Sequence, residues 1–269
     1  MKKSLVSVLI VTFNAEQYIY NTIKSCLKQT YSPIEILILD NGSTDNTVKI
    51  IKKFKKNKNF HIYTTNKNKG PYGGLNYLLT QAKGQYIAIL DHDDLWLPEK
   101  IETQIKFLES HPKEIACGTQ TYIYYEYKNI LILDRKPLKV HYVNHISLMF
   151  KNKGFRYNLK YLFSDEHFEK IILKGKTSKI HCIPRALAIH RIRKDRNNFS
   201  RKRYKLNTKF LQEYFYINTF NIQNIINLIG YIVFRYFPPH LEWIIIKIIK
   251  RNSQKITLYE FQKKHPGII

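Results

Sequence analysis

The sequence predicts an α/β protein in which helices flank a mixed sheet, followed by a helical C-terminal appendage. Two observations predict this fold. Apolar runs of strand length alternate with helix-like segments over the first 110 residues, and polar or acidic residues follow several of these runs. A chain of 269 residues, 44% of them hydrophobic, is long enough to bury one sizeable core.

Four apolar runs have the length of buried parallel strands. They cover residues Leu5–Val11, Ile34–Leu39, His61–Thr64 and Tyr86–Leu90. The first run follows two lysines, as in a signal peptide, but TFNAEQ comes next without a small-residue cleavage site. We therefore interpret the run as the first strand.

Helices are predicted between these strands. Asn14 can cap a helix whose apolar residues recur from Ile19 at four-residue spacing, and either Thr44 or Asp45 can cap the next helix. The glycines of GPYGG mark a loop before a helical NYLLTQA segment. Pro98 then starts a fourth helix.

Composition limits the classes of protein to which this chain can belong. Cys26, Cys117 and Cys182 lie far apart without CxxC spacing, which argues against a disulfide framework or a zinc site and fits a reducing, cytoplasmic compartment. A net charge of +25 is typical of nucleic-acid-binding proteins. However, Lys, Asn, Ile and Tyr are abundant together, as an AT-rich coding sequence produces. We therefore do not expect nucleic acid as a partner.

Acidic residues lie at the ends of two predicted strands. Asp40 ends the second strand, and Asp91, Asp93 and Asp94 follow the fourth in LDHDD. Ligands of open parallel sheets bind beyond the carboxyl ends of the strands. Two carboxylates one residue apart can hold Mg²⁺ or Mn²⁺ together with a nucleoside diphosphate. The alternative is that these acids form turns and helix caps.

Several motifs together resemble the family 2 glycosyltransferases of the GT-A fold, a Rossmann-like class. They are SVLIVTFNAEQYIYNTIKSCLKQTY, IEILILDNGSTDNT, NKG and AKGQYIAILDHDDLW followed by PEKIETQIKFLE, over residues 4–110, with a weaker continuation to Ser200. The resemblance implies inverting, metal-dependent transfer of a hexose from a nucleotide sugar. It also implies a nucleoside pocket and a metal site. The pocket would contain Thr12, Asn14, Asp40 and Asn41, and the metal ligands would be Asp91 and Asp93, with Asp94 orienting them.

The resemblance also implies a catalytic base in FSDEHF. Relatives usually show Glu-Asp with the second acid as base, whereas this chain has Asp165 followed by Glu166. Residue type favours Asp165 and position in the pair favours Glu166, so both remain candidates. Alternatively, Ser164 caps a helix and the two acids stabilise its first turn.

Three positions depart from the family pattern. Asn41 replaces a second Asp in the DDGS-like motif, and Leu75 stands where an Arg often faces the diphosphate. The usual Tyr-Arg-Ile-His reads HRIR at residues 190–193, so an Arg replaces the His. Arg191 or Arg193 can bind the diphosphate, because a guanidinium binds oxygens bidentately. The alternative is a solvated basic loop.

The chain divides into residues 1–205, the GT-A domain, and 206–269, a basic amphipathic helical region. Residues 214–234 carry a stripe of asparagines, and FRYFPPHLEWIIIKIIKR then combines aromatic, apolar and basic residues, as segments in a membrane interface do. We expect peripheral contact with anionic membrane at the inner face of the cell membrane. The alternative is that these helices pack on the catalytic domain.

The sequence thus predicts a glycosyltransferase of surface polysaccharide or glycolipid synthesis. The donor would be a nucleotide sugar, and the acceptor a saccharide or lipid-linked saccharide. One alternative is a sugar-phosphate nucleotidyltransferase, which would need a Gly-rich, basic loop that TFNAEQ lacks. Another is a basic membrane- or nucleic-acid-binding protein with a degenerate, non-catalytic GT-A core.

Overall fold

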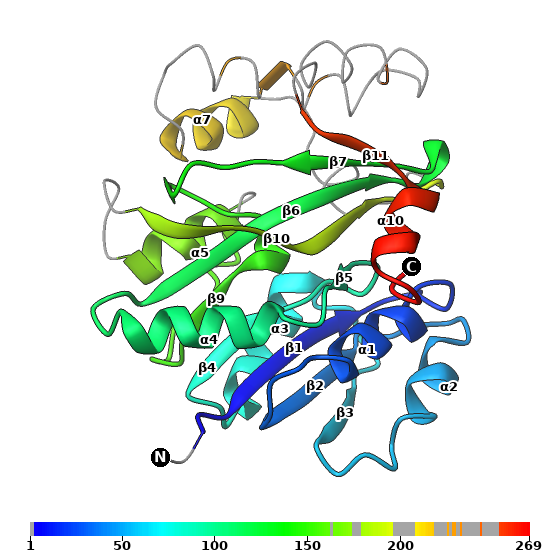
Figure 1. Ribbon diagram of the computed structural model, residues 1–269. Coiled ribbons are helices and arrows are strands. Elements are labelled where there is room, and N and C mark those ends of the chain that lie inside the picture. The colour runs from blue at the N-terminus through cyan, green and yellow to red at the C-terminus, as the bar shows by residue number, and fades with distance from the viewer. Residues whose placement is uncertain are drawn as a thin grey trace.

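The predicted apolar runs form the centre of a mixed sheet with helices on both faces (Figure 1). The computed structural model describes residues 3–161, 164–173, 179–195, 208–217 and 253–269, and residues 225, 228, 229, 232 and 243. The strands described are β1 (Val6–Thr12), β2 (Ile34–Asp40), β3 (Phe60–Thr64), β4 (Tyr86–Ile89), β5 (Leu95–Trp96), β6 (Ala116–Tyr125), β7 (Ile130–Asp134), β8 (Lys139–Val140), β9 (Met149–Lys151), β10 (Ile180–Ile192) and β11 (Lys255–Thr257).

Helices cover the sheet and connect its strands. They are α1 (Ile19–Leu27), α2 (Thr47–Lys52), α3 (Gly70–Gln81), α4 (Lys100–Ser110), α5 (Ser164–Leu173), α7 (Thr208–Ile217) and α10 (Leu258–Lys264), with 3₁₀ turns η1 (Glu126–Lys128) and η2 (His145–Ser147). All four predicted strands are confirmed, each with its bounds shifted by at most one residue.

The sheet joins a parallel half to a largely antiparallel half. β1 pairs in parallel with β2 and β4, and β3 extends this half beyond β2. β9 pairs antiparallel with both β4 and β6 and so connects the two halves. The long strand β10 runs parallel to β6 and also pairs with β5. As a result, β5, which directly follows the acidic LDHDD segment, is fixed against β10.

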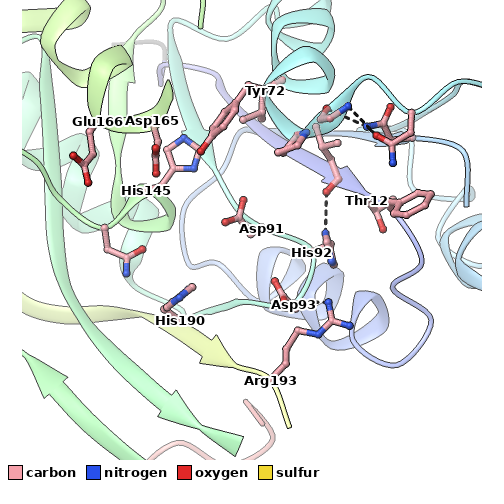
Figure 2. A pocket seen from close by; sticks show the side chains of 18 of the residues that line it. Thr12, Tyr72, Asp91, His92, Asp93, His145, Asp165, Glu166, His190 and Arg193 are labelled. Atoms are coloured by element: carbon pink, nitrogen blue, oxygen red, sulfur yellow. Dashed lines mark hydrogen bonds and ion pairs between the residues drawn. The ribbon is translucent and has the colours of Figure 1, made fainter. Parts of the chain in front are cut away.

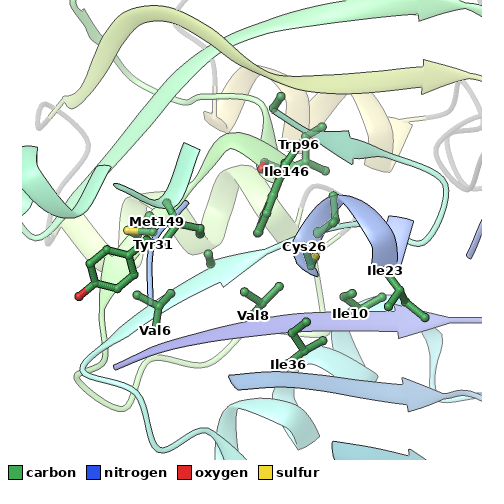
Figure 3. Packing of buried hydrophobic residues seen from close by; sticks show 14 of the residues in the cluster. Val6, Val8, Ile10, Ile23, Cys26, Tyr31, Ile36, Trp96, Ile146 and Met149 are labelled. Carbon is green, nitrogen blue, oxygen red and sulfur yellow. Dashed lines mark hydrogen bonds between the residues drawn. The ribbon is translucent and has the colours of Figure 1, made fainter. Parts of the chain in front are cut away.

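Side chains of β1 alternate between two cores, one on each face of the sheet. Val6, Val8 and Ile10 point toward α1, where Ile23 and Cys26 also lie (Figure 3). Leu9 and Val11 pack in the second core, which includes residues of α3 and α5. Because both faces are buried, the strand reads as a continuous apolar run, as predicted.

The predicted loop at GPYGG is wrong, because the structure places these residues in the first turns of α3. A Cβ added at Gly74 would lie 2.7 Å from Cγ1 of Val11 on β1. The glycine is therefore required for close packing of the helix on the sheet. The glycines predict a loop, whereas the physical reason for Gly74 is a contact between helix and strand.

The predicted cap at Asn14 is also wrong. Asn14 has a φ of 46°, and its Oδ1 accepts a hydrogen bond from the backbone N–H of Thr44 at 2.9 Å. The side chain thus fastens the loop after β1 to the loop after β2, and α1 begins five residues later without a side-chain cap. Asp45, one of two predicted caps, accepts from the N–H of Thr47, the first residue of α2.

The C-terminal region differs from the predicted helical appendage where it is described. β11 pairs antiparallel with β7 of the main sheet, and Thr257 and Glu260 form a capping box at the start of α10. Phe261 of α10 is fully buried in a third core, which also contains Tyr124 and Leu131. Most of the two predicted amphipathic segments, residues 214–251, lies outside the described residues. None of the helices in the described ranges is long and apolar enough to cross a membrane.

Candidate active site

A cavity of about 670 Å³ lies beyond the carboxyl ends of β1, β2 and β4 (Figure 2). Most of the residues predicted for the site meet there. Those that line it are Thr12, Asn14, Asn41, Asp91, Asp93, Asp165, Glu166 and Arg193. Asp40 and Arg191, which were also predicted, are buried beside the cavity and do not line it.

Two buried oxygens lie side by side at the tips of β1 and β2. Thr12 and Asp40 are paired in register, and both are buried. Thr12 Oγ1 and Asp40 Oδ1 have no hydrogen-bond partner among the described residues. The other carboxylate oxygen of Asp40 accepts from the N–H groups of Gly42 and Ser43. Buried polar atoms are rarely left unpaired in native proteins, so these two oxygens are candidates for ligand contacts.

Asn41 connects the strand tip to the loop before α3. Its Nδ2 donates to Asn68 Oδ1 at 2.9 Å and to the carbonyl of Gly70 at 3.0 Å, and its Oδ1 accepts from the N–H of Lys69. An aspartate could not make the two donated bonds. The departure from the family's second Asp therefore has a structural reason.

The three acids after β4 have different partners. Asp94 is fully buried and accepts from His190 Nδ1 at 3.0 Å and from the N–H of Arg191 at 2.7 Å. Burial lowers the pKa of His190, but the Asp94 carboxylate outweighs this and the pKa is raised to about 9. Burial and the neighbouring carboxylates of Asp94 and Asp93 raise the pKa of Asp91 well above its usual range. Asp94 thus holds β10 against the acidic segment, while Asp91 and Asp93 face the cavity.

The two predicted arginines occupy different environments. Arg191 donates from Nε to the carbonyl of Asp93 at 2.9 Å and from Nη1 to Glu126 Oε1 at 2.9 Å, so it fastens the backbone of the acidic segment to η1. Arg193 lines the cavity, with Nη1 at 3.7 Å from Asp93 Oδ2. Of the two, Arg193 is the one that a ligand in the cavity can contact.

Asp165 and Glu166 lie in the first turn of α5 and both line the cavity. Asp165 Oδ1 is buried without a hydrogen-bond partner among the described residues. Burial and then the Glu166 carboxylate raise the pKa of Tyr142 and Tyr214. Burial and then the Asp165 carboxylate raise the pKa of Tyr157. The two acids thus act on different tyrosines.

The predicted cap at Ser164 is not observed. Its hydroxyl donates to the carbonyl oxygens of Asn158 at 3.2 Å and Tyr161 at 2.6 Å, and the residue is already the first of the helix. The acids that follow it still lie near the positive end of the helix dipole.

Other cavity residues were not predicted from the sequence. His145 Nε2 lies 2.8 Å from the Tyr157 hydroxyl, and Figure 2 shows His145 beside Asp165. Burial lowers the pKa of His145, which favours the neutral imidazole. Phe13 at the tip of β1 also lines the cavity and is 41% exposed. The position of Phe13 directly after the first strand could have indicated that it lines the cavity. No sequence signal could have indicated His145, because residues 141–157 are mostly irregular.

The carboxylates of Asp91 and Asp93 fit a hard divalent cation. Among the residues that the structure describes, no group of three or more His, Cys, Asp or Glu side chains surrounds a metal-sized site. Mg²⁺ in nucleotide sites is usually held by only one or two carboxylates, with phosphate oxygens and water as further ligands. Burial and then the neighbouring carboxylates raise the pKa of Asp91, and a bound cation would offset the second of these two effects.

Comparison with known proteins identifies the family. A family model described as Glycosyl transferase family 2 matches residues 7–174. This chain belongs to glycosyl transferase family 2. The resemblance predicted from the motifs is therefore confirmed, and the family's match covers the strands that carry the acids and helix α5.

Two bacterial relatives are named as glycosyltransferases. E. coli WfaP, a UDP-Glc:alpha-D-GlcNAc-diphosphoundecaprenol beta-1,3-glucosyltransferase, is 47% identical over 106 residues, 39% of this chain and 42% of WfaP. Bacillus subtilis TuaG, a putative teichuronic acid biosynthesis glycosyltransferase, is 37% identical over 107 residues, 39% of this chain and 42% of TuaG. The matched stretch thus spans less than half the length of these relatives.

Solved structures show the same fold. S. aureus TarS 1–349 in complex with UDP aligns with a TM-score of 0.58 at 17% identity over 86% of this chain and 79% of that TarS chain. The mannosyltransferase PcManGT from Pyrobaculum calidifontis, in complex with GDP-Man and Mn²⁺, aligns with a TM-score of 0.60 at 14% identity over 96% of this chain and 78% of PcManGT. This family 2 chain therefore has the predicted GT-A fold.

Proposed function

We propose that this protein transfers a hexose from a nucleotide sugar to a hydroxyl of a saccharide or lipid-linked saccharide, with inversion at the anomeric carbon. The observation that carries the proposal is one cavity lined by two separate pairs of acids, Asp91 with Asp93 and Asp165 with Glu166. One pair suits a metal-bound diphosphate and the other suits an acceptor hydroxyl. Membership of family 2 favours this reaction over nucleotidyl transfer.

The nucleoside would bind at the tips of β1 and β2. Thr12 Oγ1 and Asp40 Oδ1 are the buried oxygens that a base could satisfy, and the Phe13 ring is exposed for contact with it. WfaP is named for a UDP-Glc donor and TarS was solved with UDP. We therefore propose a UDP-sugar donor.

The proton acceptor in this proposal is Asp165. Its buried Oδ1 has no hydrogen-bond partner among the described residues, and the side chain lies beside His145 (Figure 2). As the acceptor oxygen attacks the anomeric carbon, its proton moves to Asp165 and the bond from that carbon to the diphosphate breaks. Glu166 then has a positioning role between α5 and α7.

The departing diphosphate needs positive charge. Asp91 and Asp93 would hold Mg²⁺ or Mn²⁺, which stabilises the charge of the leaving group when bound. Arg193 lies beside Asp93 on the cavity wall, where its guanidinium can bind phosphate oxygens bidentately. In this proposal, Arg193 stands where the family usually has His, and it contacts the diphosphate.

The acceptor in this proposal is anchored in a membrane. WfaP is named for an acceptor linked to diphosphoundecaprenol. A protein bound peripherally at the inner face of the cell membrane would reach such an acceptor on the side where nucleotide sugars are present. The basic C-terminal region is our candidate for this contact.

A donor screen tests the proposal. The full chain is incubated with UDP-glucose, UDP-GlcNAc, UDP-galactose or GDP-mannose, with and without Mn²⁺, and release of nucleoside diphosphate is measured. We expect metal-stimulated release from one donor. Asp93→Asn keeps the shape of the side chain without its charge and should reduce this release at least ~100-fold. A protein that folds but releases diphosphate from none of these donors would instead support the non-catalytic alternative.

A further inference from the structure

The guanidinium of Arg193 lies beside one of the two proposed metal ligands. Its Nη1 is 3.7 Å from Asp93 Oδ2, and each side chain is only 11% exposed. Asp195 Oδ2 lies 3.0 Å from Nη2, and the Tyr18 ring lies 4.8 Å from Cζ. Burial lowers the pKa of Arg193, but the Asp93 and Asp195 carboxylates outweigh this and raise it above its ordinary value. The protein therefore holds a permanent cation at the edge of its carboxylate cluster.

The carboxylates of the cluster are not equally compensated. Asp94 pairs with His190, and Asp93 lies beside Arg193. Asp91 makes no ion pair with any residue that the structure describes. One of the two carboxylates proposed for the metal thus already has a positive charge beside it.

This arrangement gives the protein a different affinity for a divalent cation with and without a bound nucleotide. Without nucleotide, a cation held by Asp91 and Asp93 is repelled by the positive charge of Arg193, which lies beside the Asp93 carboxylate. Burial limits the screening of this repulsion by salt and water. A diphosphate in the cavity offers the guanidinium new oxygen partners, and its own negative charge offsets the repulsion. The two ligands therefore favour each other's binding.

We infer that Arg193 couples metal binding to nucleotide binding: it weakens binding of the metal to the empty site and makes metal and nucleoside diphosphate bind together. The inference rests on the proposed function, because it takes Asp91 and Asp93 as the metal ligands. Such coupling is reciprocal, so the nucleotide gains as much affinity from the metal as the metal gains from the nucleotide. Couplings between sites typically amount to roughly 5- to 150-fold in affinity.

Binding of Mn²⁺ to the full chain tests this inference without measuring catalysis. Electron paramagnetic resonance of free Mn²⁺ gives the bound fraction with and without saturating UDP, after subtracting Mn²⁺ bound by UDP in buffer. In the natural protein, UDP should tighten Mn²⁺ binding at least ~10-fold. Arg193→Met should bind Mn²⁺ at least ~10-fold more tightly without UDP and show a smaller effect of UDP.

Matched variants separate charge from packing. Arg193→Lys keeps the positive charge and should retain weak Mn²⁺ binding without UDP. Arg185→Met removes an exposed arginine that donates to Thr103, outside the cavity lining, and should behave as the natural protein does. Arg193→Gln is a second neutral variant for the case in which Arg193→Met does not fold, and melting curves identify the folded variants.

The outcomes distinguish this inference from the proposed function. If the folded neutral variants bind Mn²⁺ without UDP no more tightly than the natural protein, the inference is wrong. The metal site itself still stands if UDP supports Mn²⁺ binding that Asp93→Asn removes. A natural protein that binds no Mn²⁺ even with UDP contradicts both, and tight Mn²⁺ binding without any effect of UDP contradicts the coupling alone.

Discussion

The ammonium group of Lys100 lies 4.0 Å from the centre of the Trp96 ring, inside the core beneath α1 and α4. Lys100 is fully buried, and its Nζ donates to Gln104 Oε1 at 2.7 Å. Burial lowers the pKa of Lys100 to about 7. The cation–π contact and one hydrogen bond thus replace only part of the hydration that the charge loses.

Lys100 should make the folded protein more stable at alkaline pH. Between the folded pKa of about 7 and an unfolded value of about 10.4, the unfolded chain binds a proton that the folded protein lacks. Stability therefore rises with pH across this window. His190, whose pKa is raised to about 9, contributes stability that is lost over the same window in both proteins, so Lys100→Met is the reference. Relative to that variant, urea unfolding should show the natural protein gaining about 2 kcal/mol between pH 6.5 and 9. Equal pH dependence in both proteins would contradict the assigned burial of the charge.

Gly74→Ala should destabilise the fold, although alanine favours helices. The added Cβ would lie 2.7 Å from Val11 Cγ1 and 3.2 Å from Leu39 Cδ2, so α3 must shift away from the sheet. Overpacking of this kind costs about 1–3 kcal/mol. Gly73→Ala is the control, because its Cβ meets only Lys69 Cβ, at 3.0 Å. Thermal unfolding should rank Gly74→Ala well below Gly73→Ala, and the reverse order would refute the packing argument.

The strands could be predicted because their burial is recorded directly in the sequence. β1, β2 and β4 are covered on both faces and read as apolar runs. Polar residues at their ends, Thr12, Asn41 and Asp91, reach one cavity because parallel strands end at one edge. Glu35 interrupts one run without ending the strand, because the buried carboxylate accepts from Ser7 Oγ and from the N–H of Lys83. Local periodicity was sufficient for these elements.

The rest of the site depends on contacts between distant segments. His145 reaches the cavity from the short turn η2, whose path is set by packing, and no spacing indicates it. Arg191 and Arg193 are two residues apart on or just beyond the same strand, yet one fastens η1 and the other lines the cavity. β11 joins β7 across more than 100 residues of chain, which a local pattern cannot predict.

Asp165→Asn and Glu166→Gln should separate the proton acceptor from its neighbour. If Asp165 accepts the acceptor's proton, its amide variant should bind donor normally and turn over at least ~100-fold more slowly, as expected for loss of a general base. Glu166→Gln keeps the shape beside Tyr142 and Tyr214 and should retain most of its turnover. Donor affinity is measured by calorimetry and turnover by release of nucleoside diphosphate in the presence of acceptor. The opposite ranking would transfer the role to Glu166.

The C-terminal segment should bring the protein to anionic membranes. Residues 234–251 combine aromatic residues, isoleucines and flanking cations, and lie outside the described residues apart from Trp243. Each Lys or Arg near an anionic surface contributes about 1 kcal/mol, and an apolar helix face adds its own burial. Removing the whole region is an unsuitable test, because Phe261 of α10 is buried in the core of the sheet domain.

Substitutions within the segment test the membrane contact instead. Sedimentation with phosphatidylglycerol vesicles should show binding that increases with anionic lipid and decreases with salt. Replacing Lys247, Lys250 and Arg251 with Gln should weaken it roughly 100-fold, since three basic contacts are lost. Replacing the exposed lysines at positions 52, 53 and 55 with Gln removes equal charge from the other end of the chain and should have a smaller effect. Binding that persists at high salt would indicate an inserted apolar face, whereas a full chain that ignores these vesicles at low salt would leave the segment as a packing or oligomer contact.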